Sequence, residues 1–541
     1  MSSIEGKIRN IEANVLDKHH EQQPLLKRSQ IEAVTHLLKI HNNNLRDLLS
    51  ESDRWSRNSW VYELMYLDKA LEQSLRWVLK NCSPHHFFST DSWTDIDDEA
   101  FSLMLWARSY CKLRNDHIAA SRGFYVTSCD ENLCEIRFQF KDVGDFAVLT
   151  SQIASWSFHT SNFLSDVPEI ELQNIFESYK NRVDFTNLDK SFSFNHDLSD
   201  ANYHALKSWS RRAILPELYD SEDLDGFTLG QIRDLWTLIF LESQLLTRIE
   251  IHTDALFGSE NDFSGFNYQL LISELVENFS RLLETDSCIV SKIISFLTFD
   301  ESSQKSSLIN SHFVKIGSER ISILYWNVVS TNPNLLFSSA LAKRSRRNIY
   351  ENLIQKIEQR SVERIALAIQ NAKYIVLKEK VLVDQENRKI RPDLIVYDPS
   401  TYQLLIVDYK HAIPPFNASE VANRLKDLDK WIEQVRRYLR FANKNRNIFQ
   451  ELGFETISKV DGLLLFRYPM AIPAPLEADI TFGDWESLSV ILSNTNPPSI
   501  NEILRFYRSA RDADQYTRNW KIDEEFIEVG TWTYKRPIIV A

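Results

Sequence analysis

Two acidic residues and a lysine stand at the ends of two neighbouring apolar runs. The first run, residues 390–397 (IRPDLIVY), carries Asp393 near its start, and the second, 403–410 (QLLIVDYK), ends with Asp408 and Lys410. Carboxylate oxygens are ligands that Mg²⁺ prefers, and the metal lowers the pKa of bound water and neutralises charge on a phosphate. A lysine beside it can orient the attacking water. These residues predict metal-dependent phosphoryl chemistry, with Mg²⁺ as cofactor and Mn²⁺ able to substitute.

The residues between the runs favour a tight turn. Residues 398–401 (DPST) are turn formers, so a β-hairpin is expected, and it brings Asp393 close to Asp408. Asp408 and Lys410 are two apart and share one face of their strand, while Tyr409 points to the other face. The backbone carbonyl of Tyr409 is expected to add a third oxygen ligand. The competing interpretation is a hairpin whose strand ends carry charges because strands end at the surface.

The pattern Pro-Asp, fourteen residues, Asp-x-Lys resembles the core motif of the PD-(D/E)xK nuclease superfamily, which has the restriction-endonuclease-like fold. The resemblance covers roughly residues 345–495. It implies an α/β domain with a mixed sheet, a helix with a glutamate before the hairpin and a second helix after it. It also implies hydrolysis of phosphodiester bonds in nucleic acid.

A helix is expected before the hairpin. Residues 361–370 (SVERIALAIQ) are helical in period and lead into an apolar strand at 374–383. Glu363 precedes that strand by about three helical turns, which resembles the glutamate position of archaeal Holliday-junction resolvases, and it is our first candidate for the third acid and metal ligand. Glu351 and Glu358, seven apart on one face of the same helical region, are the alternatives. For each of the three, an ordinary solvated glutamate is the competing interpretation.

A second helix is expected after Pro414-Pro415, over residues 418–443, where apolar residues recur at helical spacing. Gln434 and Tyr438 are four apart and therefore lie on one face. Gln-x-x-x-Tyr after the Asp-x-Lys lysine is similar to the additional motif of the RecB-like branch. That similarity implies that Gln434 helps to hold the active-site water and lysine and that Tyr438 contacts substrate. A helix flank packed on the sheet is the competing interpretation.

Positive charge is concentrated in the same part of the chain. Residues 343–446 contain 22 Lys and Arg and 13 Asp and Glu, a net charge of +9, whereas the whole chain has −13. A basic module on an acidic protein predicts a polyanionic partner, because phosphate contacts supply most non-specific affinity. With the resemblance, the partner is nucleic acid, DNA more than RNA. Phosphate contacts are expected at residues 343–347 (KRSRR) and at Arg436, Arg437 and Arg440, unless these form only a solvated helix face.

The chain is too long, at 541 residues, for one ordinary core, and its 43% hydrophobic and 25% charged residues are typical of a soluble protein. The fold class expected is a multidomain α+β protein. Its expected parts are residues 1–200, a helical region with a hairpin at 124–140; 201–335, a helical region; 336–495, the nuclease-like α/β domain with a mixed sheet; and 496–541, a C-terminal extension.

Several classes of protein are excluded by pattern. No stretch is long and apolar enough to span a bilayer, and the polar N-terminus does not fit a signal peptide, so a cytoplasmic protein is expected. Five scattered cysteines argue against a disulfide framework and a zinc site. No glycine-rich phosphate loop occurs, so no nucleotide-driven motor is expected.

Three functional hypotheses follow. The first is a nuclease, of the restriction type or in DNA repair, whose residues 1–335 select substrate, and which assembles as an oligomer. The second is a nucleic-acid-binding scaffold without turnover; the intact Asp393, Asp408 and Lys410 count against it. The third is an effector subunit activated through residues 1–335 by a partner protein or a signalling ligand.

Overall fold

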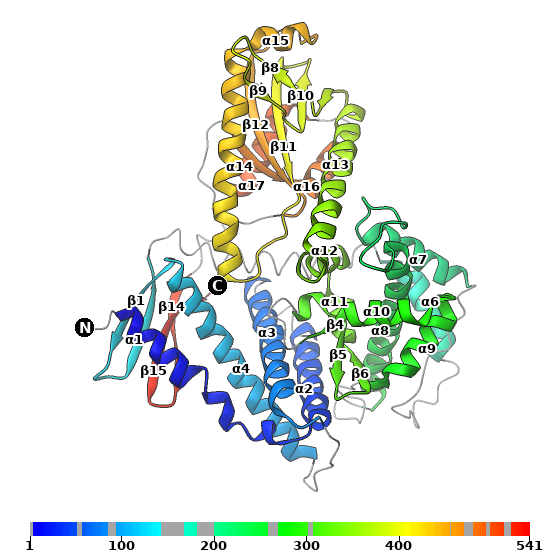
Figure 1. Ribbon diagram of the computed structural model, residues 1–541, viewed down its shortest axis with the longest axis vertical. Helices are drawn as coiled ribbons and strands as arrows, with labels where there is room; N and C mark the ends of the chain where they lie inside the picture. The colour runs from blue at the N-terminus through cyan, green and yellow to red at the C-terminus, as the bar shows by residue number, and fades with distance from the viewer. Residues whose placement is uncertain are drawn as a thin grey trace.

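The computed structural model describes residues 4–50, 57–84, 93–141, 167–180, 200–257, 269–300, 307–454, 456–469, 480–493, 498–512 and 521–540. Helices and several sheets mix along the chain, so the expected α+β class is confirmed. Figure 1 shows an upper lobe, built on a sheet with helices at its sides, standing on a broader and mainly helical base. None of the helices in these ranges combines the length and apolarity needed to cross a bilayer.

The left part of the base joins the two ends of the chain. Its elements are helices α1 (Ile4–Ile11), α2 (Gln30–Ser50), α3 (Arg57–Asn81) and α4 (Trp93–Ser121), the short π-helix η1 (Glu12–Leu16), the 3₁₀ helices η2 (His19–Gln22) and η3 (Pro24–Lys27), and strands β1 (Tyr125–Asp130), β2 (Glu135–Phe140), β14 (Lys521–Val529) and β15 (Trp532–Val540). Strands β1 and β2 form the expected hairpin. Strand β15 pairs with β2 in parallel, so the red C-terminal strands complete the sheet of the cyan hairpin (Figure 1). Tyr534 of the expected C-terminal extension is thereby fully buried.

The right part of the base is not purely helical. Its elements are α6 (Glu169–Lys180), α7 (Ala201–Ala213), α8 (Leu229–Phe257), α9 (Ile272–Leu283), α10 (Ser287–Leu297), η6 (Leu308–Asn310) and α11 (Tyr325–Ser330), with strands β3 (Gln269–Leu271), β4 (Thr298–Phe299), β5 (Phe313–Ile316) and β6 (Arg320–Ile323). The strands form a small sheet in the order β3-β6-β5-β4. The expectation of a helical region over residues 201–335 is therefore incomplete. Strands of two to four residues are too short to show a readable alternation in the sequence.

The upper lobe contains a five-stranded mixed sheet in the order β13-β12-β11-β10-β7. The strands are β7 (Ile375–Lys378), β10 (Leu394–Asp398), β11 (Gln403–Lys410), β12 (Lys459–Phe466) and β13 (Ile480–Asp484); β8 (Leu382–Val383) and β9 (Lys389–Ile390) form a separate small ribbon. The lobe's helices are α12 (Pro333–Arg344), α13 (Arg347–Asn371), α14 (Ala418–Lys444), α15 (Arg446–Glu451), α16 (Trp485–Leu492) and α17 (Ile500–Asp512). Strands β7, β10 and β11 are antiparallel, whereas β11, β12 and β13 are parallel.

The alternation of side chains along β11 explains how helices cover both faces of this sheet. Ile406 points to the face on which α14 packs through Ile432, whereas Val407 points to the face covered by α13, α16 and α17. Helix α17 belongs to the expected C-terminal extension, and its Leu504 packs on the same face as α13. Because both faces are covered, the side chains at the ends of the strands are the ones that remain near the surface.

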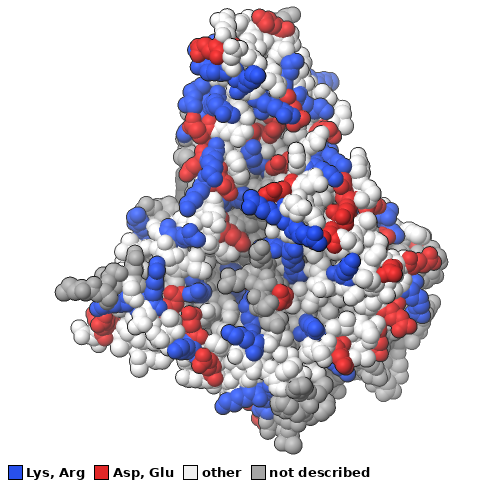
Figure 2. Space-filling view, in the orientation of Figure 1, with Lys and Arg blue, Asp and Glu red and all other residues white. Residues whose placement is uncertain are grey.

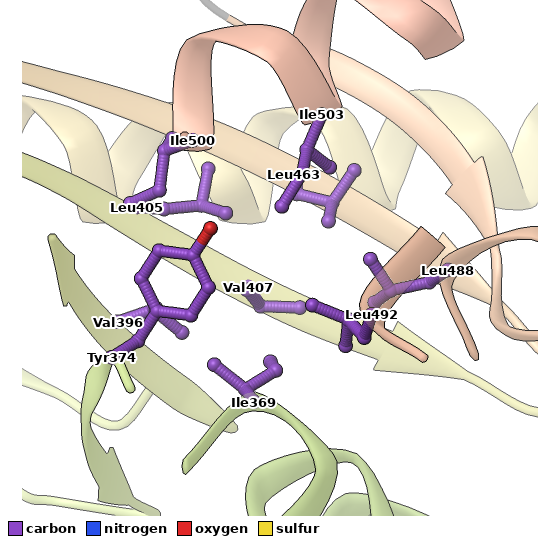
Figure 3. A pocket seen from close by; sticks show the side chains of 10 residues that line it. All are labelled: Ile369, Tyr374, Val396, Leu405, Val407, Leu463, Leu488, Leu492, Ile500 and Ile503. Carbon is purple, nitrogen blue, oxygen red and sulfur yellow. The ribbon is translucent and has the colours of Figure 1, made fainter. Parts of the chain in front are cut away.

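A cavity lies between the sheet and the helices of the α13 face. Figure 3 shows its lining, in which aliphatic side chains such as Ile369, Val407 and Leu463 surround the ring of Tyr374. Its volume of about 10 Å³ is room for no more than one water molecule, and the apolar lining offers such a water few partners. The cavity is therefore a packing gap rather than a binding site.

Candidate active site

The β10–β11 hairpin places the two sequence-predicted aspartates opposite each other. The last paired residues at the open end of the hairpin are Leu394 and Val407, so Asp393 and Asp408 follow as the next facing positions. The carboxylate of Asp393 accepts a hydrogen bond of 2.7 Å from the backbone N–H of Tyr409. A strand residue directs its N–H and C=O to the same side, so the carbonyl of Tyr409 also faces the side of Asp393.

Asp408 and Lys410 share one face of β11, as their spacing predicts. Lys410 Nζ lies 2.8 Å from Asp408 Oδ2. Asp408 is almost completely buried, with 1% of its side chain exposed, and Lys410 retains 18%. The ion pair is therefore largely shielded from solvent, and its two members are held in contact.

Helix α14 connects to both strands of the hairpin through the Gln-x-x-x-Tyr pair. Gln434 Nε2 donates to Asp408 Oδ1 at 3.1 Å and to the hydroxyl of Tyr438 at 2.8 Å. That hydroxyl in turn donates to the carbonyl of Arg391 at 3.2 Å. Tyr438 is 3% exposed. In this conformation it positions the chain next to Asp393, and the substrate contact implied by the resemblance would require it to become accessible.

Helix α13 brings a glutamate to the site, but not the first candidate. The carboxylate of Glu358 is half-buried and accepts the backbone N–H of His411 at 3.2 Å, directly after Lys410. Glu363 is exposed, and Glu351 is exposed in an ion pair with Arg347. The structure therefore brings Glu358, and not the first candidate Glu363, to the site. Five residues turn a helix by about 140° beyond a full turn, so Glu363 and Glu358 cannot face the same site.

The carboxylates of the site disturb one another's protonation. Burial, followed by the charge of Asp408, raises the pKa of Asp393 to about 6. Burial raises the pKa of Asp408, with a further contribution from Glu358, and the ammonium of Lys410 opposes that rise. Burial also raises the pKa of Glu358, to which Asp393 adds. These shifts have one cause, which is negative charge gathered away from water with too little positive charge to balance it.

The same negative charges stabilise the protonated form of Lys410. Burial alone would lower its pKa, but the negative charges of Asp408, Asp393 and Glu358 raise it above the ordinary value. The lysine is therefore a cation at neutral pH. It can donate protons in hydrogen bonds or stabilise a phosphate, and it is not suited to act as a general base.

Glu379 is a further acid near the site that sequence reasoning missed. The strand expected over residues 374–383 breaks at this residue, which adopts a φ of 45° and donates its N–H to the carbonyl of Asp393 at 2.9 Å. Its carboxylate lies 3.0 Å from Arg391 and contributes to the raised pKa of Asp393. A positive φ is uncommon for a residue other than glycine, and no pattern in the sequence indicated this one.

The oxygen atoms at the site are of the kind that binds Mg²⁺, although their positions do not enclose a place for an ion. Asp393, Asp408 and Glu358 offer hard carboxylate oxygens, and Tyr409 offers its carbonyl. Among the contacts of the described residues, Asp393 and Glu358 each accept a hydrogen bond from a backbone N–H through one carboxylate oxygen. No group of three His, Cys, Asp or Glu side chains in the described ranges is close enough to hold a metal ion. In this conformation the carboxylates instead bind Lys410 and two backbone N–H groups.

The basic residues expected to contact phosphate fall into two groups. Arg344, in the run at residues 343–347, is largely buried and donates to the side chain of Asn310 at 2.7 Å, so the prediction of a phosphate contact is wrong for this residue. On α14, Arg436 and Arg440 both pair with Glu433 on the exposed face. Figure 2 shows Lys and Arg side chains distributed over the upper lobe and the part of the base below it, with Asp and Glu among them.

Two other arginines lie beside the acids. Arg437 is exposed, and its charge lowers the pKa of Asp408, so it lies near that carboxylate. Arg391 is exposed and lies next to Pro392 and Asp393. The two are linked through Tyr438, whose ring lies 5.5 Å from the guanidinium of Arg437 and whose hydroxyl binds the carbonyl of Arg391.

The sequence matches no protein-family model, and searches of curated proteins and of solved structures also give no match.

Proposed function

We propose that this protein is a metal-dependent nuclease that hydrolyses phosphodiester bonds in nucleic acid, DNA more than RNA, in defence against foreign DNA or in DNA repair. The observation that carries the proposal is the meeting of Asp393, Asp408 and Lys410 at the ends of two adjacent strands, with Gln434 bound to Asp408. A charged hairpin end without a function would not require a buried aspartate held by both a lysine and a glutamine.

The arrangement of the upper lobe supports a restriction-endonuclease-like fold. Helix α13, strand β7, the β10–β11 hairpin, helix α14 and strand β12 follow one another in the order that the resemblance implies. Strands β10 and β11 are antiparallel, and β11 and β12 are parallel, which gives the expected mixed sheet.

Asp393, Asp408 and the carbonyl of Tyr409 would hold Mg²⁺, with Glu358 in place of Glu363. Three carboxylates face a single ammonium, and their raised pKa values indicate a need for further positive charge. When bound, the metal supplies a more acidic water and neutralises charge on the phosphate.

The other side chains have roles that follow from their contacts. Lys410, protonated and held by Asp408, orients the attacking water or stabilises the phosphate. Gln434 keeps Asp408 oriented. Arg391 and Arg437, exposed on either side of Tyr438, contact the phosphates that flank the scissile bond.

The test is to incubate the purified protein with supercoiled, linear and single-stranded DNA and with RNA, in Mg²⁺, in Mn²⁺ and in chelator. Lys410→Ala is the inactive variant. Lys459→Ala is its matched control, because Lys459 pairs with Asp461 at 2.9 Å on the neighbouring strand β12, away from the site. We expect cleavage that requires metal, is lost in Lys410→Ala and persists in Lys459→Ala. Binding without cleavage under every condition would instead support the scaffold.

A second candidate function is an effector nuclease that requires activation by a partner protein or ligand. The observation that favours it is the 1% exposure of Asp408, because a phosphate cannot reach a carboxylate that solvent does not reach. Cleavage that appears only after a cellular fraction or partner is added would distinguish this form from a constitutive enzyme.

A further inference from the structure

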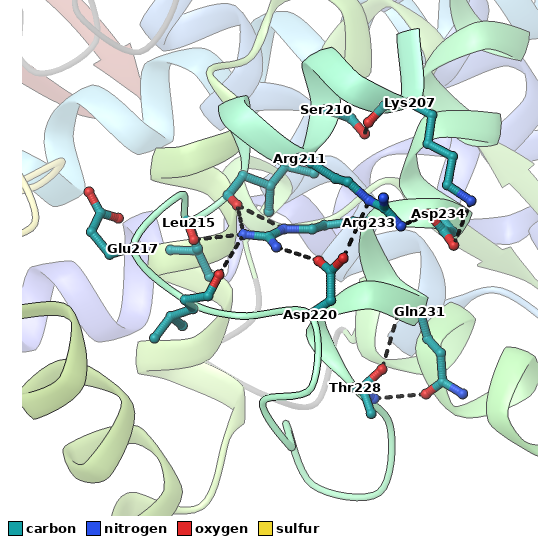
Figure 4. A network of polar contacts seen from close by, with 12 residues as sticks. Lys207, Ser210, Arg211, Leu215, Glu217, Asp220, Thr228, Gln231, Arg233 and Asp234 are labelled. Atoms are coloured by element: carbon teal, nitrogen blue, oxygen red, sulfur yellow. Dashed lines mark hydrogen bonds and ion pairs between the residues drawn. The ribbon is translucent and has the colours of Figure 1, made fainter. Parts of the chain in front are cut away.

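A loop of the helical base lies against the upper lobe. The docking loop, residues 214–228 between α7 and α8, is held by the side chain of Arg233, which is 4% exposed. Arg233 donates to the carbonyls of Ile214 (2.7 Å), Leu215 (2.8 Å) and Leu218 (3.3 Å) and to the carboxylate of Asp220 (2.5 Å). Figure 4 shows this fork inside the loop and the carboxylate of Glu217 directed away from it. Arg233 therefore holds the loop together from inside, and the side chain of Glu217 points away from Arg233 toward other parts of the protein.

Acidic residues of the docking loop match a basic stripe on α13. Lys356, Arg360 and Arg364 recur every four residues and so lie on one face of that helix. Glu222 accepts from Lys356 at 2.6 Å and from Arg360 at 3.1 Å. Glu217 binds Arg364 at 3.1 Å, and its carbonyl accepts from Arg360 at 2.9 Å. Two acids of the base thus fix the helix that carries Glu358.

Glu217 also connects to the strand that carries Lys410. Its carboxylate lies 2.6 Å from the guanidinium of Arg467, and both side chains are about 95% buried, with 5% and 4% exposed. Arg467 directly follows β12, and its backbone N–H donates to the carbonyl of Lys410 at 3.1 Å. Arg467 also donates to Asn334 at 3.1 Å. Glu217 of the base is therefore connected through Arg467 to the backbone of Lys410.

We propose that the docking loop positions the candidate active site, with Glu217 and Glu222 setting the place of Glu358 relative to Lys410. Glu217 acts on Lys410 through Arg467, and both acids act on Glu358 through α13. The role of these groups in catalysis rests on the proposed function, whereas the mechanical connection does not. The base is thus required for the geometry of the site as well as for any binding that it performs.

The burial of the Glu217–Arg467 pair favours positioning over a reversible contact. Removing one member of a buried ion pair leaves the other charge uncompensated. In the described part of the chain, Glu217 provides the carboxylate that pairs with Arg467, whose Nε and Nη1 atoms have no hydrogen-bond partner there. A loop that dissociates reversibly would instead be held by solvent-exposed ion pairs, which cost little free energy to separate.

The test uses the full-length chain and compares wild type with Glu217→Gln and Lys356→Gln. Hydrogen exchange, read by mass spectrometry, follows the amides of residues 410–412, where the N–H of His411 is bound by Glu358. We expect exchange about tenfold faster in Glu217→Gln and a smaller increase in Lys356→Gln, because protection reports local opening. We also expect the affinity for Mn²⁺ to fall more in Glu217→Gln than in Lys356→Gln. Where the protein cuts, kcat falls while KM is unchanged, because the exposed arginines that contact substrate are untouched.

Glu99→Gln is the matched control, because Glu99 pairs with Arg28 at 2.6 Å in the left part of the base, outside the docking loop and its contacts. Its exchange at residues 410–412 should equal that of wild type. Arg364→Gln, which removes a half-exposed contact of Glu217, replaces Glu217→Gln if that variant does not fold. Wild-type exchange at residues 410–412 in a folded variant whose docking loop exchanges faster would overturn the inference. Absence of metal binding and cleavage in wild type would defeat the proposed function alone, since exchange is still measured.

Discussion

Gln434 on helix α14 and Asp408 on strand β11, 26 residues apart in the chain, are joined by a hydrogen bond of 3.1 Å. The amide of Gln434 has two hydrogens, and the second is donated to Tyr438 at 2.8 Å. Tyr438 then donates to the carbonyl of Arg391, one residue before the Pro-Asp pair. One face of α14 therefore orients the side chain of Asp408 and also holds the backbone of Arg391, close to Asp393.

The first prediction concerns this orientation. Gln434→Ala removes the donor to Asp408, and we expect Mn²⁺ affinity to fall about 10- to 100-fold, as is typical when a residue that orients a metal ligand is lost. Glu433→Ala is the control, because the adjacent Glu433 is exposed and pairs only with arginines of its own helix among the described contacts. Titration calorimetry on both variants measures the effect. Equal affinities would show that Gln434 only packs α14 on the sheet.

The second prediction separates the helix acids. Glu358→Gln should reduce Mn²⁺ affinity and cleavage by at least about tenfold, because Glu358 lies against the N–H of His411, beside Lys410. Glu363→Gln should leave both within about twofold of wild type, because Glu363 is exposed on another face of α13. The pair of variants differs only in position along one helix. A larger loss in Glu363→Gln than in Glu358→Gln would contradict the assignment.

Strand β11 was predictable to the residue, because an unbroken apolar run bounded by turn formers leaves little choice of boundary. The facing of Asp393 and Asp408 followed from hairpin geometry alone. The turn also formed as expected, with Asp398 accepting from the N–H of Ser400 at 2.9 Å. These features depend on local chemistry, which a sequence displays.

Features that depend on long-range packing could not be predicted. All three glutamates of α13 look alike in sequence, and only the docking of the helix on the sheet selects Glu358. Arg344 lies in a basic run of the sequence, yet its side chain is largely buried in the base, where it donates to the carbonyl of Thr298 and to the side chain of Asn310. The pairing of β15 with β2 joins segments about 400 residues apart, for which no local signal exists.

The third prediction is a pH dependence of stability. The pKa of Asp393, raised by burial and by Asp408 to about 6, exceeds that of an unfolded aspartate, so the folded protein binds the proton more tightly. The contribution of Asp393 to stability in chelator should therefore be most favourable near pH 4 and decline as the pH rises toward 6. Asp393→Asn removes the buried charge and should be about 1–3 kcal/mol more stable than wild type at pH 8, with no difference at pH 4. Urea unfolding at several pH values measures both.

Asp398→Asn provides the control of opposite sign. Burial alone would raise the pKa of Asp398, but hydrogen bonds from Ser400 and Thr401 bring it below the ordinary value. Its charge therefore stabilises the folded chain above about pH 4, and this contribution is lost as the pH falls. Asp398→Asn should be less stable than wild type at pH 8, and the difference should shrink in acid. Both variants shifting stability in the same direction would contradict the account of the site's charge.

The fourth prediction tests the two exposed arginines beside the acids. Each phosphate contact releases counterions, so the logarithm of binding affinity falls with the logarithm of salt concentration in proportion to the number of contacts. Arg391→Gln and Arg437→Gln should each weaken binding of a DNA oligonucleotide and reduce that slope by about one. Arg391 pairs with Glu379 in the free protein, so its effect should be the smaller at low salt.

Arg281→Gln is the control for this measurement, because Arg281 is exposed on α9 of the base and not on the upper lobe. Fluorescence anisotropy in chelator, from low to physiological salt, yields the slopes without cleavage. If Arg281→Gln reduced the slope as much as Arg437→Gln, the positive charge would act through the field of the whole molecule, and the nucleic acid would not be held beside Asp408. A reduction confined to Arg391 and Arg437 places the phosphates next to the buried carboxylates, where hydrolysis requires them.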